Sequence, residues 1–221
     1  MLMQWRACRE RCRRAASFLL VDIVLVRHAT CAQMGSVLLG RSVDLPLDER
    51  GEGQARVAAR RLLAFPDLVV ESSPRRRARH TAGIIAAQSD TVVRIAPQMD
   101  EVDFGSWSGQ SFEALASDPL WQRWNKYRSV ARTPAGDSIR DVQARALAHF
   151  RKLQHSVGDK TIAIVTHAEV IRAVVLLALQ APIDDYHRFE IGPASLTRLT
   201  VEDTQLKLEA GELVGAHSGF G

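Results

Sequence analysis

The sequence predicts an α/β protein, a three-layer α/β/α sandwich built on a mostly parallel sheet. Short continuous runs of β-branched and aliphatic residues recur along the chain, which is typical of strands buried on both faces. Segments with apolar residues at helical spacing separate these runs, as in alternating strand–helix units. The 221 residues are 46% hydrophobic and 24% charged, so the chain can bury the core of one globular domain.

The first strand–helix unit begins near residue 23. Residues 23–26 predict a buried strand, and the polar group Arg27-His28-Ala29-Thr30 follows at its carboxyl end, where open α/β sheets bind ligands. Residues 31–47 show no periodicity and predict a loop. Asp48 predicts a helix N-cap, because small and aliphatic residues recur after it at helical spacing: Ala55, Ala58, Ala59, Leu62 and Leu63.

A second unit follows in the same pattern. Residues 68–70 predict a strand, and Ser72-Ser73-Pro74 predicts a serine cap followed by proline at the first helical position. The helix is expected to continue through Ala78, Ala82 and Ile85, and residues 91–95 predict a third strand.

Residues 97–136 differ in texture and predict a lid-like insertion. They hold three of the four tryptophans and an aromatic, helix-like stretch at 121–127. Trp107, Trp121, Trp124 and Tyr127 could line a pocket for a ring-bearing ligand or form the hydrophobic underside of the insertion. We favour the second interpretation.

The C-terminal part returns to strands and helices. Ser138 predicts the cap of a helix whose inward face is Ile139, Val142, Ala146, Phe150 and Leu153. Residues 161–165 predict a strand that ends at Thr166-His167, and 170–179 are apolar nearly all round, which predicts a buried helix. Residues 187–191 and 195–201 predict the last strands. The main domain is therefore placed at 21–211, with 212–221 as a frayed tail.

The basic character of the chain lies in its first residues. Five arginines and one glutamate within residues 1–14 account for the whole net charge of +4, so the rest of the chain is neutral. We interpret 1–20 as a basic, disordered extension; an organelle-targeting peptide, or a tether to RNA or an anionic membrane, are the alternatives. A neutral body offers no basic face, so no nucleic-acid partner is expected for the core. No apolar run reaches the roughly 18 residues that would predict a membrane span.

The cysteines indicate a reducing compartment. There are three, Cys8, Cys12 and Cys31, an odd and low count that gives no disulfide framework. A cytoplasmic location is therefore predicted. Cys8 and Cys12 could be half of a metal site, but no Cys/His pair with matching spacing follows them, so no metal is expected.

Two predicted strands of similar texture each end in a histidine. His28 follows the first strand, and His167 follows the strand at 161–165. If these parallel strands are adjacent, both imidazoles lie at one sheet edge. Arg27 adds a planar, permanent cation suited to bidentate phosphate binding. The pattern therefore indicates a site for a phosphoryl group, in which one histidine attacks phosphorus and the other donates a hydrogen bond.

Five motifs together resemble the histidine phosphatase superfamily, which includes phosphoglycerate mutases and bacterial phosphomonoesterases such as those acting on α-ribazole phosphate. They are LVRHAT, SSPRRRARHTA, DEVDFGSWSG, PAGDS and VTHAEVIR, and they occur in the family's order over roughly residues 22–200. Ala29 replaces a frequent glycine, and Asp137 replaces a common glutamate. The resemblance implies a phosphoglycerate mutase-like fold.

The resemblance also assigns roles to residues. His28 would be the nucleophile that forms a phosphohistidine, Glu101 the general acid and base, and His167 a donor to the transferring group. Asp100 and Asp103 compete with Glu101 for the acid role. The predicted substrate-binding residues are Arg27, Arg77, Thr30 and Arg41. Arg75, Arg76 and Arg79 are expected at the solvent or the substrate rim. His80 is expected to be structural, and His149 and His155, on a predicted surface helix, are expected to be solvated.

The implied activity is metal-independent hydrolysis of a small phosphomonoester, with no cofactor. Mutases of the family carry a Trp-Asn pair soon after the nucleophile, and the segment from Thr30 to Gly35 has none. Phosphoglycerate mutase-type transfer and a non-catalytic phospholigand-binding module remain the alternatives. The physiological substrate is left open, as is a homodimer.

Overall fold

A computed structural model gives the fold, and it describes residues 20–65, 67–134, 136–156, 160–203 and 205–215. A six-stranded sheet at its centre has the order β3-β2-β4-β1-β6-β7. The four strands from β3 to β1 are mutually parallel. β6 pairs antiparallel with β1, and β7 pairs antiparallel with β6. The strand bounds are β1 (Leu20–Arg27), β2 (Val69–Ser72), β3 (Val93–Ile95), β4 (Thr161–Thr166), β6 (Leu196–Glu202) and β7 (Gln205–Gly211). The predicted mostly parallel sheet is confirmed.

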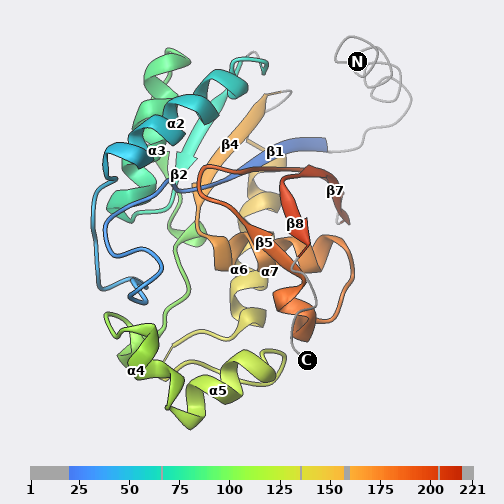
Figure 1. The fold of residues 1–221 in the computed structure, drawn as a ribbon. Helices are drawn as coiled ribbons and strands as arrows, with labels where there is room; N and C mark the ends of the chain where they lie inside the picture. The colour runs from blue at the N-terminus through green and yellow to red at the C-terminus, as the bar shows by residue number, and fades with distance from the viewer. Residues whose placement is uncertain (1–19, 66, 135, 157–159, 204, 216–221) are drawn as a thin grey trace.

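Helices cover both faces of the sheet, as Figure 1 shows. Helices α2 (Glu49–Leu62) and α3 (Arg76–Gln88) pack on one face, and α6 (Ile139–Gln154) and α7 (Ala168–Ala178) pack on the other. The three-layer prediction is therefore also confirmed.

The alternation of side chains along the strands produces the two cores. In β1, Val24 and Val26 join the core under α2 and α3, while Ile23 and Leu25 join the core under α6 and α7. All four are at most 2% exposed. Burial of each such side chain contributes about 2 kcal/mol, so the central strands are anchored from both sides.

Two of the predicted helix starts are capped as expected. Asp48 accepts a hydrogen bond from Gly51 N, and Ser138 forms a capping box with Asp141. The inward face predicted for α6 is buried in full. Among the described helices, none is long and apolar enough to cross a membrane.

The segment 97–136 packs onto the body through its aromatic residues. It contains the short helices η1 (Pro97–Met99), η2 (Gly105–Trp107), α4 (Phe112–Ala116) and α5 (Pro119–Lys126). Trp107 and Trp124 are at most 1% exposed, and the Trp107 and Trp121 rings lie 5.3 Å apart, edge to face. Tyr127 is 45% exposed. These contacts favour the interpretation of the tryptophans as hydrophobic packing.

Arg128 attaches the end of α5 to α7. Its Nη1 donates to Glu169 Oε2 at 2.7 Å, and its guanidinium lies 3.9 Å from the ring centroid of Tyr186 in η3 (Ile183–Arg188). The Tyr186 hydroxyl donates to the same carboxylate at 2.6 Å. This buried cluster joins the 97–136 segment to the first turn of the helix that follows His167.

The serine cap predicted for α3 is wrong. The helix begins at Arg76, and its N-cap, Arg75, makes no side-chain cap bond. Asp44 instead accepts from Arg76 N at 2.5 Å. The Ser73 hydroxyl does not cap the helix because it lies 2.7 Å from His167 Nε2.

The prediction of a solvated His149 is also wrong. This residue is 8% exposed, and its Nε2 lies 2.6 Å from Glu71 Oε2 on β2. It sits on the flank of α6 that carries Ala146 and Phe150, so it faces the sheet. His155, by contrast, is exposed as predicted.

The C-terminal part of the chain contains two strands that were not predicted. β7 is an additional strand paired with β6, and β8 (Leu213–Gly215) pairs with β5 (Phe189–Ile191). Residues 213–215 therefore do not belong to a frayed tail, because they form a second, two-stranded sheet. The rest of the predicted tail and the extension at 1–19, including Cys8 and Cys12, lie outside the described residues.

Gly105 is a position where the 97–136 segment has no room for a side chain. Its φ is +56°, and a Cβ would lie 1.5 Å from Pro134 O. We expect Gly105→Ala to lower the free energy of unfolding by about 2–4 kcal/mol in urea titrations. The control is Gly83→Ala on α3, where a Cβ meets nothing within 4 Å, and it should raise stability by up to about 1 kcal/mol. Equal effects would contradict the backbone clash.

Candidate active site

The ends of three parallel strands meet at one edge of the sheet. His28 N donates to Thr166 O at 2.9 Å, which joins the residue after β1 to the end of β4. Ser73 N donates to Val165 O at 2.9 Å, which adds the end of β2. This pairing brings His28, Ser73 and His167 together, as predicted for the two histidines.

The two imidazole rings are neighbours and lie edge to face. Their ring centroids lie 5.2 Å apart, and the planes meet at 62°. His28 is 4% exposed and His167 is fully buried. His28 Nδ1 lies 2.8 Å from Ala29 O, which can only accept, so this nitrogen carries the proton. The lone pair of His28 is therefore on Nε2, the nitrogen next to Arg77.

Arg77 lies between the catalytic candidates. Its Nε donates to His28 Nε2 at 3.3 Å, and its Nη2 lies 3.3 Å from His167 Nδ1. Nη2 also donates to Gly40 O at 2.9 Å and lies 3.7 Å from Glu101 Oε2. The side chain is 1% exposed. A fully buried cation between two imidazoles is a strong attraction for an anion.

Burial and Arg77 keep both histidines neutral. Desolvation lowers the pKa of His28 well below its ordinary value, and Arg77 and Arg27 lower it further. Desolvation also lowers the pKa of His167 well below its ordinary value, with Arg77 and His28 adding to the effect. A neutral His28 with its lone pair on Nε2 is the form that can act as a nucleophile.

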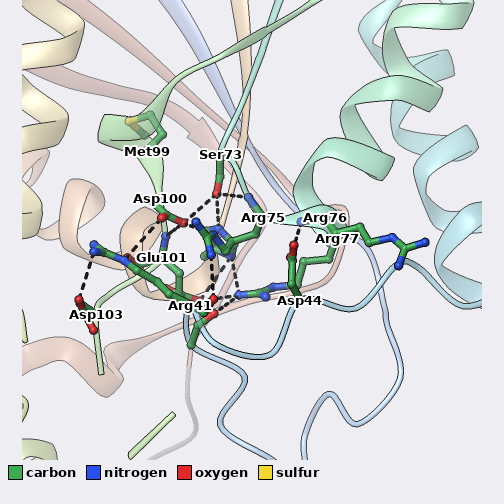
Figure 2. A network of polar contacts seen from close by, with 12 residues as sticks. Arg41, Asp44, Ser73, Arg75, Arg76, Arg77, Met99, Asp100, Glu101 and Asp103 are labelled. Carbon is green, nitrogen blue, oxygen red and sulfur yellow. Dashed lines mark hydrogen bonds and ion pairs between the residues drawn. The ribbon is translucent and has the colours of Figure 1, made fainter. Parts of the chain in front are cut away.

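Glu101 is the carboxylate that reaches this centre. Its Oε2 lies 3.4 Å from His167 Nδ1, and burial raises the pKa of Glu101 from 4.5 to about 7, although Arg77 opposes the rise. Asp100 points toward Ser73 and Arg75 instead, and Asp103 pairs with Arg41 (Figure 2). Geometry therefore favours Glu101 over both neighbours as the group that exchanges protons.

Two predicted substrate-binding residues, Arg27 and Thr30, are held by other protein groups. Arg27 Nη2 lies 3.5 Å from Met34 Sδ, and its Nη1 donates to Ile191 O. The Thr30 hydroxyl donates to Gln54 Oε1 at 2.7 Å. Contacts therefore join His28, Arg77, Glu101 and His167 directly, whereas Arg27 and Thr30 border them.

Arg41 has a structural environment that the sequence did not indicate. Its guanidinium lies 2.9 Å from Asp137 Oδ2 and 3.3 Å from Asp103 Oδ2, and its Nε donates to Glu101 O at 2.8 Å (Figure 2). Arg145 Nη2 donates to the same carbonyl at 3.2 Å. Arg41 thus holds the backbone of the acid candidate.

Several features around the site were not predicted from the sequence. They are Gln54, Arg145 and the hydrogen-bonding role of Ser73. Arg145 precedes Ala146, which lies on the predicted inward face of α6, so the helical pattern could have placed Arg145 near the sheet. The contacts of Gln54 and Ser73 join distant segments, and no local pattern indicates them. Arg75 was expected at the solvent or the rim, and it is half-buried against Asp100, whereas Arg76 and Arg79 are exposed.

Within the described part of the chain, no group of three or more His, Cys, Asp or Glu side chains is arranged to hold a metal ion. Cys31 is a buried free thiol close to the site. Burial raises the pKa of this thiol, so it is not poised as a thiolate.

Comparison with known proteins places the chain in a family. The model of the histidine phosphatase superfamily (branch 1) matches residues 23–212. The chain belongs to this superfamily. An acid phosphatase of Mycobacterium tuberculosis is 29% identical over 180 residues, which cover 79% of the chain and 83% of that protein. Phosphoserine phosphatase 1 of Hydrogenobacter thermophilus is 26% identical over 186 residues, which cover 83% and 88%.

A solved structure supports the same placement. A mycobacterial glucosyl-3-phosphoglycerate phosphatase superposes with a TM-score of 0.76 at 25% identity, over 86% of this chain and 98% of that one. The family and the phosphoglycerate mutase-like fold predicted from the five motifs are confirmed. These named relatives are phosphatases, which agrees with the enzyme class predicted from the sequence.

The raised pKa of Glu101 predicts a pH-dependent stability. Between pH 4.5 and about 7 the folded protein keeps this proton while the unfolded chain loses it, so stability is lost as the pH rises through about 7. Glu101→Gln cannot lose a proton there. Its free energy of unfolding should exceed that of wild type at alkaline pH by up to about 3 kcal/mol, and the gain should vanish below about pH 4.5.

Urea titrations across this pH range test the effect. The exposed Glu202→Gln serves as the reference for removal of one surface carboxylate. A gain in Glu101→Gln that stays constant with pH would contradict the burial of an ionisable carboxylate.

Proposed function

We propose that this protein is a metal-independent phosphomonoesterase that hydrolyses a small phosphorylated metabolite through a phosphohistidine on His28. The observation that carries the proposal is the contact between Nε2 of a neutral histidine, the nitrogen that bears the lone pair, and the buried guanidinium of Arg77. The relatives act on phosphoserine and glucosyl-3-phosphoglycerate by name, which supports a small phosphorylated substrate.

The first half of the reaction transfers the phosphoryl group. His28 Nε2 attacks phosphorus, and the bond between phosphorus and the ester oxygen breaks. Glu101 gives its proton to that oxygen, and the alcohol leaves. A carboxyl with a pKa of about 7 holds this proton near neutral pH and releases it readily, which suits a general acid.

The second half reverses the direction of the proton. The Glu101 carboxylate takes a proton from water as the water oxygen attacks phosphorus, and the phosphorus–nitrogen bond breaks. His28 returns to its neutral form, and inorganic phosphate leaves. One group serves as acid and then as base, as microscopic reversibility requires.

Charge stabilisation is assigned to the cations around the pocket. Arg77 already touches both imidazoles, so a phosphoryl group bound between them would meet its guanidinium. Arg27 adds a second positive field, since it lowers the pKa of His28. Thr30 and Arg41 border the site, and Arg41 is proposed to act by holding the Glu101 backbone.

Hydrolysis of an aryl phosphate in excess EDTA tests the nucleophile. Wild type should turn over, and His28→Ala should lose activity by at least about a thousandfold. The exposed His155→Ala is the matched control and should retain wild-type rates. Brief incubation with a ³²P-labelled substrate should label wild type and leave His28→Ala unlabelled. Activity that survives in His28→Ala would overturn the assignment.

The acid role of Glu101 predicts a dependence on the leaving group. Glu101→Gln should slow alkyl phosphate hydrolysis by about 10²–10⁴-fold and affect an aryl phosphate much less, because a good leaving group needs no proton. For the alkyl substrate, kcat/KM of wild type should fall as the pH rises above about 7, since Glu101 must be protonated.

Asp103→Asn is the control for this experiment. Asp103 is a neighbouring carboxylate that pairs with Arg41, so its loss should leave the leaving-group dependence unchanged. If Asp103→Asn instead shows the selective loss on alkyl phosphates, the acid is Asp103.

A further inference from the structure

Ser73 makes an unusual set of contacts behind His167. Its hydroxyl oxygen lies 2.7 Å from His167 Nε2, 3.2 Å from Asp100 Oδ1 and 3.3 Å from Arg75 N. Ser73 and His167 are fully buried, and Asp100 is 7% exposed. The three side chains form a continuous line from the imidazole to a carboxylate, on the side of His167 opposite the pocket nitrogen Nδ1.

The donors and acceptors in this line can be assigned. A hydroxyl donates one hydrogen and accepts two, and an ionised carboxylate only accepts. Arg75 N must donate to the Ser73 hydroxyl oxygen, and Asp100 Oδ1 must accept a hydrogen bond from the Ser73 hydroxyl. The second lone pair of Ser73 then accepts from His167, so Nε2 of His167 carries a proton. Its Nδ1 is left with a lone pair, which can accept from Arg77 Nη2 at 3.3 Å.

Asp100 is held firmly in place as the end of the line. Its Oδ1 accepts from Glu101 N at 2.8 Å and lies 3.0 Å from Arg75 Nε, and its Oδ2 lies 3.6 Å from Arg41 Nε (Figure 2). The same carboxylate therefore orients the backbone of Glu101 and terminates the hydrogen bonds that begin at His167.

Ionisable groups surround His167 from every element packed against it. They are Arg75 and Arg77 of the α3 start, His28 after β1, Glu101 after η1, Arg145 of α6, and Asp100 through Ser73. Burial lowers the pKa of His167, and the cations among these groups lower it further, so the ring is neutral. A phosphoryl dianion at Nδ1 would oppose that effect.

We propose that Ser73 and Asp100 form a relay that holds Nε2 of His167 as its proton-bearing nitrogen and supports a second proton on Nδ1 when a phosphoryl dianion occupies the pocket. The inference rests on the phosphomonoesterase function proposed above. Ser73 and Asp100 are positioning residues, because they act through His167 and do not touch the phosphoryl group.

The relay explains how a neutral His167 becomes a donor. The proton on Nδ1 comes from solvent as the dianion binds, and Nδ1–H then donates to a phosphoryl oxygen. Nε2–H keeps its hydrogen bond to Ser73, and the Ser73 hydroxyl continues to donate to Asp100 Oδ1. The proton returns to solvent when phosphate leaves, so no net proton is consumed by His167 in one turnover.

Nitrogen-15 NMR of the histidine rings tests the relay, because it reports which ring nitrogens carry hydrogen. Inorganic phosphate is the probe, at about pH 8, where it is mainly a dianion. In wild type, free His167 should be the Nε2–H tautomer, and saturation with phosphate should protonate both nitrogens.

Two variants separate the parts of the relay. Ser73→Ala should lose the tautomer preference and the protonation by phosphate. Asp100→Asn keeps the shape and an acceptor oxygen for Ser73, so it should keep the tautomer. It loses the charge, and we expect the ratio of protonated to neutral His167 with phosphate to fall about tenfold, one pKa unit. Asp100→Asn also covers the case in which Ser73→Ala does not fold.

Asp44→Asn is the matched control. Asp44 is an exposed carboxylate that accepts from Arg76 N at the start of the same helix, and no described contact joins it to His167. Its loss should leave the His167 signals as in wild type. A mere structural weakening of this region would change the control and the relay variants alike.

The His28 signals distinguish failure of the relay from failure of the proposed function. If phosphate shifts the His28 ring while His167 stays neutral in wild type, the relay is wrong and the phosphate pocket stands. The relay is equally wrong if Ser73→Ala and Asp100→Asn both match wild type. If phosphate perturbs neither ring, the proposed pocket fails and the relay fails with it.

Discussion

The buried guanidinium of Arg77 is the constraint around which the rest of the site is organised. A permanent cation with 1% exposure is costly to desolvate, and two backbone carbonyls and the nearby Glu101 carboxylate offset part of that cost. Burial lowers the pKa of both histidines, and the positive charge of Arg77 lowers it further. The site therefore combines a buried cation with two uncharged imidazoles, an environment that favours binding of a phosphate dianion.

The parallel sheet makes this arrangement possible at little cost. β1, β4 and β2 are neighbours, so hydrogen bonds between the backbones of adjacent strand ends fix the relative positions of His28, His167 and Ser73. Arg77 then enters from the first turn of α3. The cores on both faces hold the strands in place. The positions of His28 and His167 therefore depend on packed side chains such as Val26 and Ile164.

Much of this was predictable, and the exceptions share a cause. Continuous runs of β-branched and aliphatic residues predict buried strands such as β1 and β4. The five motifs place His28, Arg77, Glu101 and His167 in the family's order. The environment of His149, the partners of Arg41, the line behind His167 and the pairing of β8 depend on contacts across many residues of sequence. Local periodicity carries no information about such partners, whereas it does fix which face of a helix is buried.

The attachment of Arg128 links two distant parts of the chain. This cation is stacked on Tyr186 and paired with Glu169, two residues beyond His167 on the first turn of α7. The 97–136 segment and His167 are therefore anchored at the same turn of α7. Substitutions at Arg128 are expected to disturb both together, whereas exposed positions of α4 and α5 can vary without touching this contact.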